Sequence, residues 1–132
     1  MNSVVLGATE FANELFKAAV GVQPGIDRLT RTYTLLTVTR VQAKASGRPG
    51  PNAPTGDYRR SWNATFRSVG GALEGNAGTN KPQGRRLEFG FDGEDSLGRV
   101  YHQPPYPHVW PAANEIFPQY EAAVTALVGA FT

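Results

Sequence analysis

A twelve-residue stretch near the middle of the chain, SGRPGPNAPTGD, limits what the sequence can fold into. It places three glycines and three prolines between Ser46 and Asp57. Proline lacks a backbone N–H and has a fixed φ, so this stretch can neither continue a helix nor join the middle of a sheet. We therefore expect a loop over residues 46–57 that divides the regular structure into a part before it and a part after it.

A second stretch, residues 91–111, has a similar character. It contains acidic residues at positions 92, 94 and 95 and prolines at 104, 105, 107 and 111. This composition argues against regular structure, and we expect a second long loop. The chain has 15 glycines and 10 prolines, and twelve of these residues lie in the two stretches. The excess of these residues therefore indicates two arms on a compact body rather than disorder.

Helical spacing of apolar residues precedes the first loop. Thr9 can cap a short helix with one apolar face, which ends where Pro24-Gly25 interrupts it. That face carries Phe11, Leu15, Ala19 and Val22. The spacing continues over Gly25 to Ala45 and predicts a second helix, although the run Thr30 to Val41 has enough β-branched residues to be compatible with a strand.

The C-terminal part contains the clearest helical pattern. Apolar residues recur there at steps of four, four, three and four, at Ile116, Tyr120, Val124, Leu127 and Phe131. This spacing predicts an amphipathic helix. Pro111 suits its first turn, and we expect a kink or a restart at Pro118 because a proline inside a helix removes one backbone hydrogen bond.

Between the two loops the pattern changes to that of a hairpin. Aromatic and small residues from Tyr58 to Phe66 alternate with polar ones, the period of a half-buried strand. Gly70-Gly71 permits the positive φ angles of a tight turn, and residues 72–79 can return as the second strand. Residues 80–90 predict a short turn or helix packed on this sheet.

These elements define an α+β fold. It has a small antiparallel β-sheet, a long N-terminal helical region, a C-terminal amphipathic helix and two long Gly/Pro-rich loops. At 132 residues we expect one domain, with residues 1–24 as an extra N-terminal helical segment. The start of the chain lacks a basic segment, and nowhere are there about eighteen consecutive apolar residues. We therefore expect a soluble protein, made in a cytoplasm, with no membrane partner.

Composition points toward assembly rather than catalysis. Charged residues make up 18% of the chain, against about a quarter in typical soluble domains. The absence of cysteine excludes disulfides and thiolate chemistry. His102 and His108 lie six residues apart and match no zinc pattern, and no phosphate-binding glycine motif occurs. We expect no enzyme activity, no metal and no cofactor.

An alternative function is binding of single-stranded nucleic acid. Arginines at 59, 60, 67, 85 and 86 alternate in part with Tyr58, Trp62 and Phe66, which could stack on bases. The same pattern also fits an ordinary half-buried strand with arginines on its outer face. A net charge of only +2 favours the structural interpretation.

The order of short motifs adds a family resemblance. The motifs are APTG at 53–56 with YRRS at 58–61, GTN at 78–80, LEFG at 87–90, QPPYP at 103–107 and PA at 111–112. From about residue 26 onward the chain resembles the small neck and tail-completion proteins of long-tailed double-stranded DNA phages. In that family a helix leads into a P-x-TG-x-L-R-x-S segment, a β-hairpin, an EFG turn, a loop ending in P-x-P-F-x-x-PA and a C-terminal helix. This chain has Tyr58 at the Leu position and a longer link before Pro111.

The resemblance implies a structural virion protein. Copies would form a homo-oligomeric ring, six-fold to match a tail tube, in the neck or at the tail end. The ring would join the tail to the filled head and contact neck, connector and tail-tube proteins, with DNA passing close by. It would be made in the host cytoplasm and reside in the virion. The residues that carry the motifs or are expected at interfaces are Thr55, Gly56, Tyr58, Arg59, Arg60, Ser61, Arg85, Arg86, Glu88, Phe89, Gly90, Pro104, Pro105, Pro107, Pro111 and Ala112.

The arginines among these residues carry a more specific expectation. We expect the pairs at 59–60 and 85–86 to bind carboxylates, either within one subunit or between subunits. The carboxylates available to them include Glu88, Asp92, Glu94 and Asp95.

Overall fold

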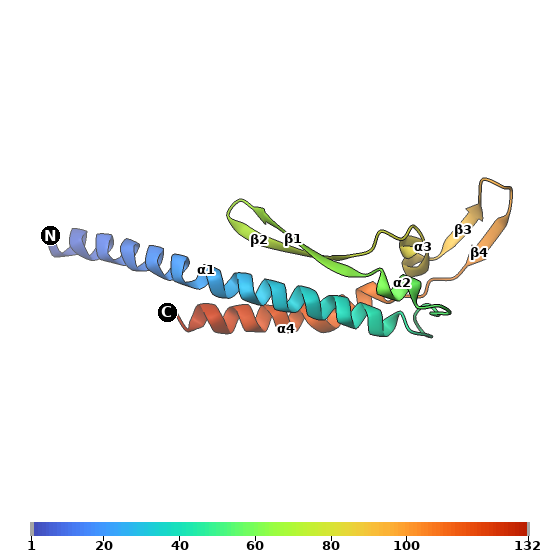
Figure 1. Cartoon of the computed structure of the whole chain (residues 1–132). Coiled ribbons are helices and arrows are strands. Elements are labelled where there is room, and N and C mark those ends of the chain that lie inside the picture. Colours follow the sequence, from blue (N-terminus) through green and yellow to red (C-terminus); the bar gives the residue numbers. More distant parts are fainter. Residues whose placement is uncertain (1, 132) are drawn as a thin grey trace.

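A computed structural model describes residues 2–131 and shows two antiparallel helices with two β-hairpins beside and beyond them (Figure 1). Helix α1 spans Asn2–Lys44 and α4 spans Val109–Gly129. Between them lie α2 (Asp57–Arg60), β1 (Asn63–Val69), β2 (Ala72–Gly78), α3 (Gly84–Phe89), β3 (Phe91–Glu94) and β4 (Val100–Gln103). The α+β class is confirmed, with two separate two-stranded sheets, β1-β2 and β3-β4, in place of one.

The predicted break at Pro24-Gly25 is wrong, because α1 continues through Pro24. The packing of α4 explains why. Leu127 of α4 lies against Gly25, and Phe131, just beyond α4, lies against Gly21, so α1 is contacted on both sides of the proline. Leu127 is half-buried and Phe131 is 46% exposed, so this packing offsets part of the lost backbone hydrogen bond, whose cost in a helix interior is about 3 kcal/mol. The expected N-terminal segment 1–24 is, over its described residues, part of this one helix.

Helices α1 and α4 are also tied together by polar contacts. Glu115, near the start of α4, binds Lys44 at 2.7 Å and Arg40 at 3.4 Å near the end of α1. Further along, the Tyr120 hydroxyl shares a 2.8 Å hydrogen bond with that of Thr30. The predicted amphipathic helix is confirmed, and it runs through Pro118 without a restart.

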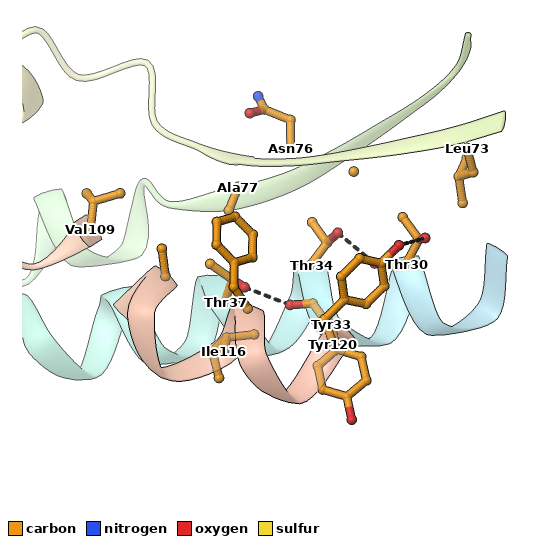
Figure 2. A pocket seen from close by; sticks show the side chains of 13 residues that line it. Thr30, Tyr33, Thr34, Thr37, Leu73, Asn76, Ala77, Val109, Ile116 and Tyr120 are labelled. Atoms are coloured by element: carbon orange, nitrogen blue, oxygen red, sulfur yellow. Dashed lines mark hydrogen bonds between the residues drawn. The ribbon is translucent and has the colours of Figure 1, made fainter. Parts of the chain in front are cut away.

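The hairpin β1-β2 lies along α1 (Figure 1). The turn prediction is confirmed, since Gly70 and Gly71 have φ of 57° and 83°. The strand itself begins at Asn63 rather than Tyr58, which instead lies in the single turn of α2. Figure 2 shows Leu73, Asn76 and Ala77 above a cleft of about 370 Å³ that α1 and α4 line from below.

The expected loop over residues 91–111 is wrong for most of its length. Residues 91–94 pair antiparallel with residues 100–103, and α4 already begins at Val109. Side chains alternate between half-buried and exposed along both short strands, and the acidic residues Asp92 and Glu94 take exposed positions. Outside the strands and α4, residues 95–99 form the hairpin turn and residues 104–108 form an irregular, proline-rich link.

The first loop is confirmed over residues 46–56 but does not project as an arm. Its chain turns back on the end of α1, where Gly47 N–H donates to the Pro51 carbonyl at 3.0 Å. A side chain at Gly50 would overlap the Lys44 carbonyl. Arg48 stacks over the Tyr106 ring at 3.6 Å, which ties the loop to the link before α4.

The core is small and lies where α1, α4 and the base of the first hairpin meet. Its buried apolar residues are Val38, Val41, Ala45, Trp62, Ala112, Ala113 and Ile116. The molecule exposes 9044 Å² of surface, whereas a compact monomer of 14.2 kDa exposes about 6,800 Å². The chain is therefore extended, with much of its surface left uncovered.

Candidate functional site

The Glu88 carboxylate caps the N-terminus of α4. Its Oε1 accepts hydrogen bonds from the backbone N–H groups of His108 and Val109 at 2.9 and 2.8 Å, and its Oε2 accepts from that of Trp110 at 3.1 Å. These are the N–H groups that a helix start leaves unpaired. Burial raises the pKa of Glu88. The three N–H donors and nearby His108 lower it by more, so the pKa lies below its usual value. Glu88 is therefore held as a carboxylate.

His108 lies under this cap and is fully buried. Its Nδ1 faces two acceptors, the Tyr106 carbonyl at 2.9 Å and Glu88 Oε1 at 3.2 Å. Nδ1 must therefore carry a proton. In the neutral ring Nε2 then accepts the hydrogen bond of the Tyr58 hydroxyl, at 2.6 Å. Both ring nitrogens are thus used inside the protein.

Tyr58 and Trp62 complete this group, which we call the junction cluster: Tyr58, Trp62, Glu88 and His108. The rings of Tyr58, Trp62 and His108 meet edge to face, with centroids 5.5–6.3 Å apart. Burial raises the pKa of the Tyr58 hydroxyl, the Trp62 side chain opposes this, and the charge of Glu88 adds to it. Trp62 is 7% exposed and packs on Val41 and Ala112. The cluster therefore joins the end of the first loop, the end of α3 and the start of α4.

The APTG-x-YRRS segment forms the turn that delivers Tyr58. Gly56 has φ of 79° and is buried against Arg59 and Arg60, so a side chain there would be strained and would meet both guanidinium groups. The Thr55 hydroxyl accepts the Asp57 N–H at 3.3 Å. Both arginines stabilise this turn through side-chain contacts: Arg59 donates a hydrogen bond to Ser46, and Arg60 forms an ion pair with Asp57.

The GTN segment meets this turn from the far end of β2. The hydroxyls of Ser61 and Thr79 share a hydrogen bond of 2.5 Å. Gly84, which opens α3, is buried against Tyr58 and Thr79 and leaves no free space for a side chain. These contacts set the position of α3, and therefore of Glu88, relative to Tyr58.

The LEFG and QPPYP segments meet at the base of the second hairpin. Gly90 has φ of 80°, and a side chain there would come within 3.0 Å of the Gln103 carbonyl and the Pro105 nitrogen. The Tyr106 N–H donates to the Leu87 carbonyl at 2.6 Å, and Gln103 donates to the Arg86 carbonyl at 3.1 Å. The five motifs, which are spread over sixty residues of sequence, therefore converge on one junction.

Most of the expected site residues lie in or around this junction, but at different depths. Glu88 and Gly56 are buried, Tyr58, Arg59, Ser61, Gly90 and Pro111 are half-buried, and Ala112 is in the core. Exposed members are Thr55, Arg60, Arg85, Arg86, Phe89, Pro104, Pro105 and Pro107. The sequence prediction missed His108 as the centre of the junction. Its one signal was a histidine placed directly before the apolar stripe of the last helix.

Of the four arginines expected to bind carboxylates, Arg60 does so within the described chain, with Asp57 at 2.7 Å. No described ion pair joins these arginines to Glu88, Asp92, Glu94 or Asp95, and Arg86 stacks over the Phe91 ring at 4.0 Å. Glu88 caps α4, and Asp95 binds Arg99 at 2.6 Å. Pairs between subunits remain a prediction.

The arginine and aromatic strand proposed for nucleic-acid binding is not an open surface. Trp62 is buried in the core, Tyr58 is bonded to His108, and Arg31 of α1 lies over the Phe66 ring at 5.0 Å. Trp62 is therefore not accessible to a base, and Tyr58 and Phe66, both half-buried, are already engaged by partners within the chain. Of the five arginines, Arg59 is half-buried and the other four are exposed.

His102 is exposed and lies 3.2 Å from Asp92, while His108 is buried, so the two histidines do not share a site. Within residues 2–131 no group of three or more histidine and acidic side chains is placed to hold a metal ion. No described helix is long and apolar enough to cross a membrane.

Comparisons of the chain with family models, curated proteins and solved structures found no match. Its function must therefore be inferred from its own residues and geometry.

Proposed function

We propose that this chain is a structural protein of a tailed phage virion, which forms a homo-oligomeric ring in the neck or at the tail end and joins the tail to the DNA-filled head. The proposed class comes from the ordered motifs and their resemblance to neck and tail-completion proteins. Their convergence on one junction supports it, because the matched segments then belong to one structural unit.

The large exposed surface carries the proposal that copies assemble. The chain exposes roughly 2,300 Å² more than a compact monomer of its mass. A subunit in a ring has two neighbours, and a standard interface covers about 800 Å² on each partner. Two such contacts would cover about 1,600 Å² per subunit, most of the excess.

The chemistry of this surface agrees with its area. Large apolar side chains that are at least 65% exposed are Phe16, Phe89, Leu97, Val100 and Trp110. Aromatic residues are enriched in the centres of protein interfaces. Four of these five, all except Phe16, lie at the end of the molecule that carries the β3-β4 hairpin, in or beside α3, this hairpin and the start of α4. This end therefore has the character of a contact surface.

Binding of single-stranded nucleic acid is the weaker proposal. It needs exposed aromatic faces beside the arginines, but Trp62 is buried, and the half-buried Tyr58 and Phe66 are bound by His108 and Arg31. A ring around DNA needs no such faces.

Sedimentation velocity and negative-stain electron microscopy of the purified protein test the proposal. We expect a discrete ring, and we expect heads without joined tails when the coding sequence is removed from the phage that carries it. A monomer at every soluble concentration, together with normal virions after the deletion, would contradict the proposed function.

A further inference from the structure

A cleft of about 490 Å³ opens beside the junction cluster. Its walls include Trp62, Pro82, Phe89 and Trp110, so they are largely apolar. Phe89 and Trp110 remain 74% and 66% exposed, which leaves much of this apolar surface in contact with water.

The rim of the cleft is positively charged. Lys81 and Arg85 line it, and neither side chain has a hydrogen-bond or ion-pair partner within residues 2–131. The segment 79–89 carries three basic residues against one acidic residue, and that acidic residue, Glu88, is buried under α4. An occupant of the cleft should therefore present apolar side chains together with negative charge.

The second hairpin has this complementary chemistry. It carries three carboxylates, Asp92, Glu94 and Asp95, against one arginine. Asp95 is used inside the turn, where it binds Arg99 and accepts the backbone N–H groups of Leu97 and Arg99. These bonds, first among them that from the Arg99 N–H, lower the pKa of Asp95 and fix the shape of the tip. Asp92 and Glu94 stay exposed on the strand.

The tip of this hairpin also carries uncovered apolar side chains. Leu97 is 75% exposed and Val100 is 65% exposed. Figure 1 shows β3 and β4 projecting from the end of the molecule, away from the helices and away from α3 at their base. The tip is directed outward, so it is placed to reach a neighbouring molecule rather than its own cleft.

We propose that the β3-β4 hairpin of one copy docks in the Lys81/Arg85 cleft of a second copy, with Leu97 against Trp110 and Phe89 and with Glu94 facing Arg85. The opposite charges of arm and cleft, and the exposed apolar side chains on both, carry this assignment. The contact joins two different surfaces, so a pair held by one contact keeps one free arm and one free cleft, and further copies can add until the rotation closes a ring. The inference rests on the proposed ring and specifies its interface.

Two variants separate the arm from the cleft. Leu97→Asp changes the exposed tip of the arm, and the double substitution Lys81→Glu/Arg85→Glu reverses the rim. Each should weaken self-association at least about tenfold, the loss expected when one well-buried apolar contact or charge pair is removed. Val69→Asp, at the exposed end of β1, is the matched control and should assemble as the original protein does. Circular dichroism checks that all variants fold.

Mixing the arm variant with the cleft variant is the decisive measurement. Each alone should sediment as a monomer, but the equimolar mixture still contains one intact arm and one intact cleft. We therefore expect a discrete heterodimer, and no ring, in the mixture. A charge exchange, Glu94→Arg with Arg85→Glu, should restore part of the assembly that Arg85→Glu alone removes.

Rings that persist in the arm and cleft variants would overturn this interface while leaving the proposed function standing. Loss of assembly in both variants without a heterodimer on mixing would also overturn it. A protein that forms no oligomer at all would contradict the interface and the ring together.

Discussion

β1-β2 and β3-β4 are both two-stranded antiparallel hairpins, yet only the first lies against the helices. Strand β2 crosses α1 so closely that a side chain at Gly75 would overlap the Thr34 hydroxyl. The second hairpin is held at its base, by Gly90 on Pro105 and by Gln103 on Arg86. An isolated two-stranded hairpin is marginally stable in water. One hairpin is therefore part of the body, and the other has the form of an arm that gains support from a neighbour.

The largest expected difference concerns the aromatic residues at the two hairpin bases. Trp62 precedes β1 and is buried, while Phe89 precedes β3 and is exposed. Trp62→Ala should lower the free energy of unfolding by about 3–5 kcal/mol, because it leaves a core cavity. Phe89→Ala should change it by less than about 0.5 kcal/mol. Urea unfolding of both variants measures this contrast, and equal losses would show that the two bases are equally part of the core.

Gly75→Ala tests the contact of the first hairpin with α1. The added methyl group meets Thr34, so we expect a loss of about 2–3 kcal/mol, measured by chemical unfolding. Gly75→Ala combined with Thr34→Ala should recover part of that loss. Gly129→Ala, where no described atom outside the adjacent turns of α4 lies within 4 Å of the added group, is the control and should be neutral or slightly stabilising. An unchanged stability in Gly75→Ala would mean that the hairpin does not press on α1.

Glu88→Gln should loosen the second hairpin and leave the first in place. Glutamine keeps an acceptor but loses the charge at the start of α4, so we expect a loss of about 1–2 kcal/mol at neutral pH. Because the folded-state pKa of Glu88 lies below its usual 4.5, its contribution is present above about pH 4.5 and is lost as pH falls through the folded-state pKa. Stability of the variant should therefore depend less on pH in that acidic range.

Hydrogen exchange locates the effect of Glu88. At neutral pH the variant should exchange faster over residues 91–103, while β1 and β2 keep their protection. Faster exchange of both hairpins would indicate that Glu88 supports the whole body and not the base of the arm.

The smallest effect is expected at the exposed pair between Arg67 and Glu74, which joins β1 to β2 at 2.9 Å. Both side chains are largely in water, so Glu74→Gln should cost less than about 0.5 kcal/mol and the cost should vanish in high salt. Thermal unfolding at low and high salt checks this. A larger loss would mean that the first hairpin depends on its own cross-strand pair more than on α1.

The sequence predicts the elements whose signal is local. The steps from Ile116 to Phe131 and the pair Gly70-Gly71 identify a helix and a turn because their residues determine the backbone directly. Pro24 misleads because part of its cost is offset by contacts of α1 with Leu127 and Phe131, which are distant in sequence. The hairpin at 91–103 is missed because its strands have four residues each, too few for a pattern to show beside acidic and proline-rich neighbours.

The same distinction applies to the site. The motif order singles out Gly56, Ser61, Glu88 and Gly90 as candidate site residues, but it does not predict that their segments contact one another. His108 lies between three of these segments, since it binds Tyr58, Tyr106 and Glu88. A single sequence contains no signal for such long-range contacts, and a histidine beside prolines has no distinct spacing.

Helix α1 sets a direction along the molecule. With 43 residues it is about 65 Å long, and the arm projects near its last residue while the N-terminus and the end of α4 lie toward the other side (Figure 1). A fluorophore or purification tag fused to either chain end would therefore stay clear of the arm and its cleft. Labelled protein could report assembly in real time without obstructing the contact that it is meant to follow.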